Sequence, residues 1–180
     1  MRNNPDKITL GSGKAYLVEY TGTMPDVATI CVDDNELGKI QGGAELTYTT
    51  ETHEEKDDLG TVAKVVVTSE EAVLKLGLIT FNGDTLAKLV DRCKVTTAAG
   101  KRTIHIGGAG NAQGKEWVVC FHHEDEKDGD IWVMGRGANR AGLTLAFAVD
   151  AGSKIEPEIK FLPSSDDGTL ITYIEEISAT

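Results

Sequence analysis

The sequence contains no apolar run that approaches the ~20 residues of a membrane-spanning helix. Its opening residues, MRNNPDKITLGSGKAY, include no hydrophobic stretch of the signal-peptide type, so we expect no export. Cysteine is scarce as well, since Cys31, Cys93 and Cys120 stand far apart and form no CxxC pair. Such a scattered set is typical of reduced, buried thiols in a cytosolic product, and it argues against a disulfide framework or a zinc site.

Basic residues and aromatic residues are also few. The chain has 18 Lys and Arg against 29 Asp and Glu, and the net charge of −11 argues against binding nucleic acid over a broad face. Aromatic residues make up only 6%, which weakens the alternative of a carbohydrate- or surface-binding module, because such a module displays clustered aromatics. A length of 180 residues with 40% apolar content fits one folded domain, residues 1–180.

The charges are segregated along the chain. Residues 51–58 (ETHEEKDD) and 123–130 (HEDEKDGD) each carry five acids and one lysine. Basic residues gather instead between 88 and 102, opposed only by Asp91. This basic cluster consists of Lys88, Arg92, Lys94, Lys101 and Arg102.

Most of the chain alternates apolar and polar residues at period two, which is typical of β-strands. Residues 116–123 (EWVVCFHH) have apolar side chains at both odd and even positions, as in a strand covered on both sides. Many strands at nearly regular spacing predict a mainly β fold, either a sandwich or a barrel. The predicted strands are residues 15–20, 38–50, 61–68, 101–107, 116–123, 131–136, 143–149, 158–162 and 169–174.

One flanking α-helix is predicted around residues 83–93, because apolar residues recur there at i, i+3, i+4 and i+7. Asn82 or Asp84 can cap its start. Residues 69–81 fit either a helix or a strand, and the strict alternation of their leucines favours the strand. Residues 1–35, approximately, are rich in Gly, Asp, Thr and Asn and predict an extended N-terminal arm.

Residues 106–115 (IGGAGNAQGK) raise the question of a phosphate-binding loop. A P-loop would need glycine in place of Ala109 and Ser or Thr in place of Glu116, and a dinucleotide motif would need glycine in place of Gln113. Both motifs also require a helix after the loop, whereas a strand pattern follows here. We therefore expect a hairpin turn whose glycines supply positive φ, and no nucleotide cofactor.

Histidines and acids offer no metal site. Residues 124–129 faintly resemble a calcium loop, but no helices flank them and Gly135 stands where the bidentate glutamate belongs. A solvated acidic hairpin tip is the better interpretation. His122 and His123 point to opposite faces of a strand, so they cannot chelate one metal ion together.

No serine, cysteine or histidine lies in a recognisable nucleophile context. Arg136 and Arg140 lie in a glycine-rich segment, residues 136–142, which we interpret as a polar turn between strands, with anion binding as the alternative. We expect no catalytic residue, no metal and no cofactor, and so no enzyme. An enzyme on a β-scaffold, using His105 or the 122–123 histidines, is the competing interpretation.

Four segments occur in a distinctive order along the chain: GKIQGGAELTYTTETHEEKDDLG (38–60), TFNGDTLAKLV (80–90), GKRTIHIGGAGN (100–111) and NRAGLTLAFAVD (139–150). Their order resembles the major tail tube proteins of tailed bacteriophages and phage-like particles. The resemblance runs from about Gly38 to about Glu176 and consists of strand and turn patterns.

This resemblance implies two packed antiparallel sheets with a flanking helix, and long strands over residues 62–80. Six copies would form a ring, and rings would stack into a hollow tube through which DNA passes without specific binding. A long acidic loop, approximately residues 48–60, and the arm would reach the adjacent ring. The protein would be made in the host cytoplasm and reside in the virion tail. Its partners would be its own copies and other tail proteins, such as tape measure, terminator and baseplate components.

The segregated charges suggest how rings would meet: the acidic loop would dock on a basic surface of the next ring. Exposed ion pairs contribute only ~0–1 kcal/mol each, so they would set register more than stability. The alternatives are another ring-forming tail component, such as a terminator or hub, and a β-sandwich surface-binding module. The candidate ring–ring contacts are Glu51, Glu54, Glu55, Asp57, Asp58, Lys88, Arg92, Lys101, Arg102, Arg136 and Arg140.

Overall fold

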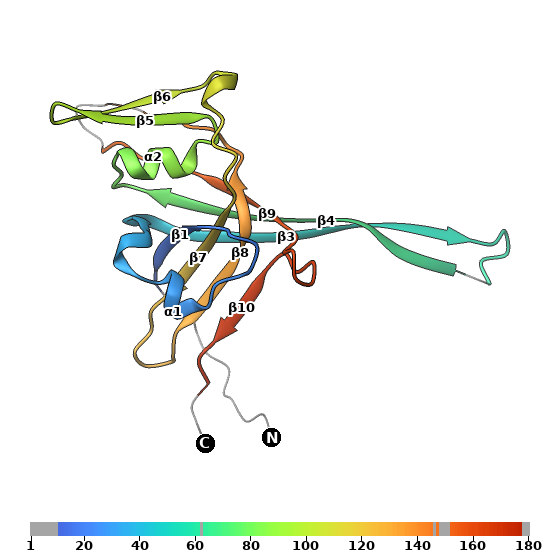
Figure 1. Ribbon diagram of the computed structural model, residues 1–180. Helices are drawn as coiled ribbons and strands as arrows, with labels where there is room; N and C mark the ends of the chain where they lie inside the picture. The colour runs from blue at the N-terminus through green and yellow to red at the C-terminus, as the bar shows by residue number, and fades with distance from the viewer. Residues whose placement is uncertain (1–10, 62, 146, 148–151, 178–180) are drawn as a thin grey trace.

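The protein folds into one large antiparallel sheet and one small one, as the computed structural model shows for residues 11–61, 63–145, 147 and 152–177 (Figure 1). The large sheet has eight strands in the order β2-β1-β7-β8-β9-β4-β3, with β10 paired to β8. Its strands are β1 (Lys14–Glu19), β2 (Glu36–Gly38), β3 (Ile40–Lys56), β4 (Ala63–Leu78), β7 (Trp117–His123), β8 (Ile131–Asn139), β9 (Glu158–Leu162) and β10 (Thr172–Glu175). The small sheet pairs β5 (Cys93–Ala98) with β6 (Lys101–Ile106).

The predicted mainly β class with two antiparallel sheets and a flanking helix is confirmed. Of the two architectures that the sequence left open, the packing is sandwich-like and the sheet does not close into a barrel. Two short helices accompany the sheets, α1 (Val27–Ile30) and α2 (Gly83–Leu89). Single 3-10 turns lie at Asp33–Asn35 and Ala109–Asn111.

The period-two pattern of the sequence divides the core into two clusters. Ala15, Leu17 and Val119 face a larger cluster that includes the buried leucines of β4. Tyr16 and Cys120 alternate with them and face a second cluster, which α1 covers. The prediction that residues 116–123 form a strand covered on both sides is therefore confirmed.

Helix α2 begins where the sequence predicted and ends earlier. The Asn82 side chain accepts hydrogen bonds from the backbone N–H of Asp84 and Thr85, at 2.8 and 3.1 Å. The predicted extension to residue 93 is wrong, because the chain turns extended at Val90 and strand β5 starts at Cys93. The helix ends there because distant side chains take its last carbonyls. Gln113 Nε2 donates to Ala87 and Val90 at 2.7 and 2.8 Å, and Asn139 Nδ2 donates to Leu89 at 3.1 Å.

The described part of the predicted N-terminal arm belongs to the body. Strand β1 lies between β2 and β7, and Ala15 and Leu17 are buried. Helix α1 then places Ile30 in the core, where Asn35 Nδ2 donates to the Ile30 carbonyl at 3.1 Å. Sequence composition suggested an arm because polar residues and glycines outnumber the few buried anchors. Residues 1–10 of that prediction lie outside the described residues.

The glycine-rich segment is not a hairpin turn. Strand β6 pairs with β5 and strand β7 pairs with β1 and β8, so residues 107–116 cross from the small sheet to the large one. Gly107 and Gly108 have φ of +87° and +85°, so the prediction of positive φ is confirmed. Asn111 Nδ2 donates to the Gly107 carbonyl at 2.7 Å and fixes the turn.

Three further strand predictions have mixed outcomes. Residues 69–78 are confirmed as strand, within β4, with Leu74, Leu76 and Leu78 buried. The predicted strand at 143–149 is wrong over residues 143–145, which adopt no strand although Leu143 and Leu145 pack against the larger core. Residues 146, 148 and 149 lie outside the described residues. Strand β8 extends to Asn139, so Arg136 lies in a strand and not in a turn.

Candidate assembly surfaces

The most distinctive feature of the molecule is a long hairpin that β3 and β4 form beyond the body (Figure 1). The acidic loop predicted at residues 48–60 is mostly strand, because β3 continues to Lys56 and β4 begins at Ala63. Paired residues run from Ala44 and Leu76 near the body to Lys56 and Ala63 at the tip, with a bulge between Glu51 and Thr52. All described residues between Glu45 and Glu71 are exposed, so the body does not cover this hairpin.

One face of the hairpin exposes several apolar side chains, with Thr50, Thr52, Glu54 and Glu70 between them. Residues directly opposite each other share a face of the sheet, and Leu46, Tyr48, Val65 and Val67 lie on the same face as buried Ala72 and Leu74. Exposed fractions on this face are 51% for Tyr48, 58% for Val65 and 55% for Val67. The core-facing side of the sheet therefore continues into solvent along the hairpin.

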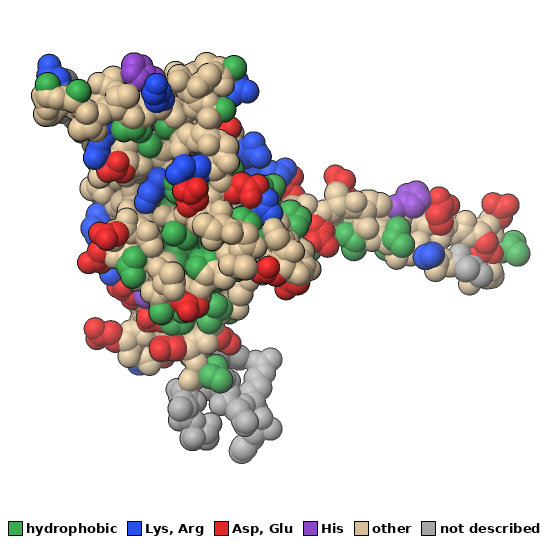
Figure 2. Space-filling model, viewed as in Figure 1, with side chains coloured by type: hydrophobic (Ala, Val, Ile, Leu, Met, Phe, Trp, Pro, Cys, Tyr) green, Lys and Arg blue, Asp and Glu red, His purple; other side chains and the backbone are tan. Residues whose placement is uncertain are grey.

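The hairpin is also acidic. From Thr50 to Glu70 it carries six acids and two lysines, a net charge of −4. Several of these acids contact neighbours on the hairpin: Glu54 with Lys56 at 3.0 Å, Glu55 with His53 at 2.8 Å, and Glu51 with the Ser69 hydroxyl at 2.8 Å. Figure 2 shows acidic and apolar side chains side by side along it.

Some side chains of the predicted basic cluster already make contacts within the chain. Lys88 on α2 is half-buried, its Nζ lies 3.4 Å from the Leu17 carbonyl oxygen, and desolvation lowers the pKa of its amine. The Arg102 guanidinium lies 2.8 Å from the Asp84 carboxylate. Arg92 is different: its backbone carbonyl accepts the Gly107 N–H at 2.8 Å, while its side chain is exposed.

The rest of the cluster lies on the outward face of the small sheet. Lys94 pairs with His105, Thr96 with Thr103, and Ala98 with Lys101, so all of these side chains share one face. The opposite face carries Cys93 and Ile104 towards α2. Residues 93–106 include no acid.

The two arginines of residues 136–142 differ in their surroundings. Arg136 is held within the molecule: its guanidinium contacts Glu116 at 2.5 Å, donates to the Pro163 carbonyl at 3.0 Å and lies 4.9 Å over the Tyr20 ring. Arg140 follows β8 with an exposed side chain. Of these two candidate contacts, the structure leaves Arg140 on the surface.

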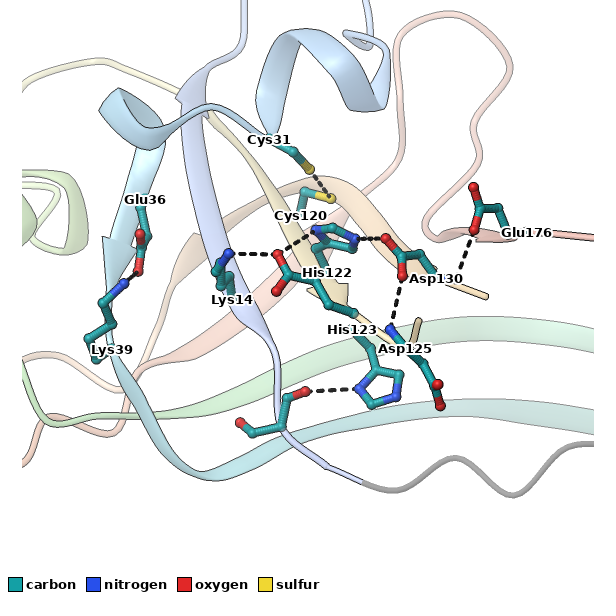
Figure 3. A network of polar contacts seen from close by, with 12 residues as sticks. Lys14, Cys31, Glu36, Lys39, Cys120, His122, His123, Asp125, Asp130 and Glu176 are labelled. Atoms are coloured by element: carbon teal, nitrogen blue, oxygen red, sulfur yellow. Dashed lines mark hydrogen bonds and ion pairs between the residues drawn. The ribbon is translucent and has the colours of Figure 1, made fainter. Parts of the chain in front are cut away.

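A polar network at the other end of β7 ties both terminal strands to one turn (Figure 3). His122 Nε2 lies 2.8 Å from Asp130 Oδ2, and the His122 ring stacks on Trp132 at 4.9 Å between centroids. Asp130 Oδ1 accepts the Asp125 N–H at 2.9 Å, which lowers the pKa of the Asp130 carboxyl, with His122 adding to the effect. Residues 124–130 thus form the acidic hairpin tip that the sequence predicted.

This network fastens strands β1 and β10 to the 124–130 turn. Lys14 on β1 contacts Glu124 at 2.6 Å, and the Glu176 N–H after β10 donates to the Asp130 carbonyl at 2.9 Å. On the opposite side of β7, His123 Nδ1 lies 2.8 Å from the Ser12 carbonyl oxygen. A histidine–aspartate pair can in principle orient an imidazole for proton transfer. Here the His122 ring stacks on Trp132, and the contacts of the network join β1 and β7 to the 124–130 turn.

The three cysteines are free thiols, and burial raises the pKa of each one. Cys31 and Cys120 lie 3.7 Å apart between their sulfur atoms, in contact without a bond. Across the described residues, no group of three or more His, Cys, Asp or Glu side chains is placed to hold a metal ion. Nor does any described helix have the length and apolar character to cross a bilayer.

No family model matches this chain, and a search of curated proteins finds no significant match. The β3–β4 hairpin, the basic β5–β6 sheet and the resemblance in sequence pattern are therefore the features that indicate a function.

Proposed function

We propose that this protein is a structural subunit that assembles with copies of itself into stacked rings, forming a tail tube of the bacteriophage type. The observation that supports this most is the β3–β4 hairpin, which extends from the body with Tyr48, Val65 and Val67 exposed to solvent on one face. Long exposed strands with apolar side chains mark an interaction site or an aggregation hazard. Assembly with identical copies would cover it.

The edges of the sheets support the same proposal. Strand β3 ends the large sheet and pairs only with β4, and β5 and β6 pair only with each other among the described strands. Edge strands of this kind present unpaired backbone groups that other chains can complete. A closed ring of copies would satisfy such edges without leaving one free.

The charge of the chain fits a conduit for DNA. A net charge of −11 favours repulsion of phosphates, so that a duplex would slide through the tube and not adhere to its wall. Six-fold rings, the virion location and contacts with tape measure, terminator and baseplate components are part of this proposal through the resemblance. A tail component that stops at one ring is the nearest alternative.

Electron microscopy of concentrated purified protein tests the proposal. We expect tubes with an axial channel. A matched variant replaces residues 50–70 by Asn-Gly, which joins the directly paired Thr49 and Glu71 through a two-residue turn. We expect this variant to keep the circular dichroism and cooperative unfolding of the body and to form no stacks. Single rings from the intact chain would favour a terminator or hub, and a monodisperse monomer at all concentrations would overturn the proposal.

A further inference from the structure

The structure separates the basic residues that could receive a neighbour's hairpin from those that could not. Lys88 is half-buried against β1, Arg102 is paired with Asp84, and Arg136 is held by Glu116, Tyr20 and Pro163. Using any of these for another molecule would first break a contact within the chain. On the outward face of β5–β6, the side chains of Lys94, Lys101 and His105 lie together. Among the described residues, none of these three side chains has an ion pair or hydrogen bond that would first have to break.

The β5–β6 sheet and the β3–β4 hairpin are complementary in charge. The hairpin segment from Thr50 to Glu70 has a net charge of −4, whereas residues 93–106 carry three basic residues and no acid. Of these three, Lys94 and Lys101 lie on the outward face, whereas Arg102 lies on the face turned towards α2, together with Val95 and Ile106. Opposite charges steer association and fix the register of an interface.

The two elements cannot meet within one molecule. The β3–β4 hairpin and the β5–β6 sheet leave the body in different directions (Figure 1). The contact is therefore between copies, and it joins two different surfaces. Contacts of this head-to-tail type generate closed rings or open stacks, because each copy offers both surfaces.

We propose that the outward face of β5–β6, with Lys94 and Lys101 at its two ends, is the docking site for the β3–β4 hairpin of a second copy of this chain. This docking site rests on the proposed self-assembly. It specifies the surface that receives the hairpin, for which the sequence offered two candidates, the 88–102 cluster and the Arg136–Arg140 segment.

A charge-swap experiment tests the site. Variant one carries K94E and K101E, and variant two carries E54K, E55K, D57K and D58K. Each variant alone brings like charges together, so we expect the stacked fraction in sedimentation to fall at least tenfold for both. Mixed in equal amounts, the acidic hairpin of variant one meets the basic sheet of variant two, and the reverse, so stacking should return.

A matched control, K39E with K154E, makes the same change of net charge at two exposed lysines outside the small sheet and should stack as the wild type does. Stacking by K94E/K101E alone, or failure of the mixture to restore stacking, overturns the docking site while leaving tube formation by the wild type intact.

Zero-length carbodiimide crosslinking detects the contact even if no tubes form. The sample is an equal mixture of ¹⁵N-labelled and unlabelled wild-type chains, so that crosslinks between two copies can be recognised. We expect mixed-isotope crosslinks from Glu51, Glu54 or Glu55 to Lys94 or Lys101. Intermolecular crosslinks that consistently avoid these lysines overturn the site. If no tubes form but these crosslinks appear, the tail-tube proposal fails and the docking site stands.

Discussion

Tyr48 and Ala72 are direct partners across β3 and β4, yet Ala72 is fully buried whereas Tyr48 is 51% exposed. This pair marks the point where the sheet leaves the body. One step inward on the same face, Leu74 is buried, and further out Val67 is exposed. The same face of the sheet therefore serves the core at one end and, beyond the polar Thr50–Glu70 pair, exposes valines to solvent at the other.

The exposed valines of the hairpin should matter for assembly and little for folding. In V65T/V67T the shape is nearly kept and the apolar methyl contact is reduced. Because both side chains face solvent, we expect the free energy of unfolding to change by less than about 0.5 kcal/mol per substitution, while stacking weakens. Urea unfolding and sedimentation velocity measure the two effects.

Leu74→Ala is the control from the same face. Leu74 is 1% exposed, so its truncation should cost about 2–5 kcal/mol. Equal loss of stability in V65T/V67T and L74A, or unchanged stacking in V65T/V67T, would contradict the division between core and assembly surface.

The start of α2 depends on one amide oxygen. Asn82→Ala removes the acceptor of the Asp84 and Thr85 N–H groups and should lower the free energy of unfolding by about 1 kcal/mol. Asn82→Asp keeps an acceptor at the helix N-terminus and should remain within a few tenths of a kcal/mol of the wild type. Thermal unfolding of both variants measures these changes. If N82D were as unstable as N82A, the capping role of Asn82 would be refuted.

The acidic turn should make the fold sensitive to low pH. The backbone hydrogen bond from Asp125, followed by the contact with His122, lowers the pKa of Asp130 in the folded state. A lowered folded pKa stabilises the protein above the unfolded value of about 3.9, and this stabilisation is lost as the pH falls towards the folded pKa.

Asp130→Asn keeps a hydrogen-bond acceptor for Asp125 and removes the titration. We therefore expect the difference in free energy of unfolding between pH 5 and pH 3 to be smaller in D130N than in the wild type. Urea titrations at several pH values measure it. A slope in D130N as steep as the wild-type slope would exclude Asp130 as a source of acid sensitivity.

The thiols should react slowly in the native protein. Burial raises the pKa of Cys31, Cys93 and Cys120, and the thiolate is the reactive species. With iodoacetamide at pH 8 we expect each thiol to be alkylated more slowly in the native protein than in urea, because a raised pKa leaves less thiolate and burial blocks the reagent. Mass spectrometry should find Cys120, the most deeply buried thiol, modified last, and its early modification would mean that β7 opens readily.

Local pattern was enough for much of the fold. The alternation in residues 116–123 predicted a strand buried on both faces, and the leucines of residues 74–78 predicted a strand over a competing helix start. The sequence also placed the helix start at Asn82 or Asp84, and the structure shows that Asn82 is the cap. These features depend on side chains within a few residues of each other, so a single sequence carries them.

Distant contacts decided the rest. Helix α2 stops at Leu89 because Gln113 and Asn139 take its carbonyls, and neither residue is near it in the sequence. The acidic segment became a paired hairpin because residues 63–71 lie opposite it. The charge pattern identified Lys94 and Arg136 alike as basic, but only the folded chain shows that Arg136 is enclosed by Glu116 and Tyr20 while Lys94 lies on an outward face. Composition fixes how much charge a chain has, whereas the packing of segments far apart in sequence fixes which charges are left for another molecule.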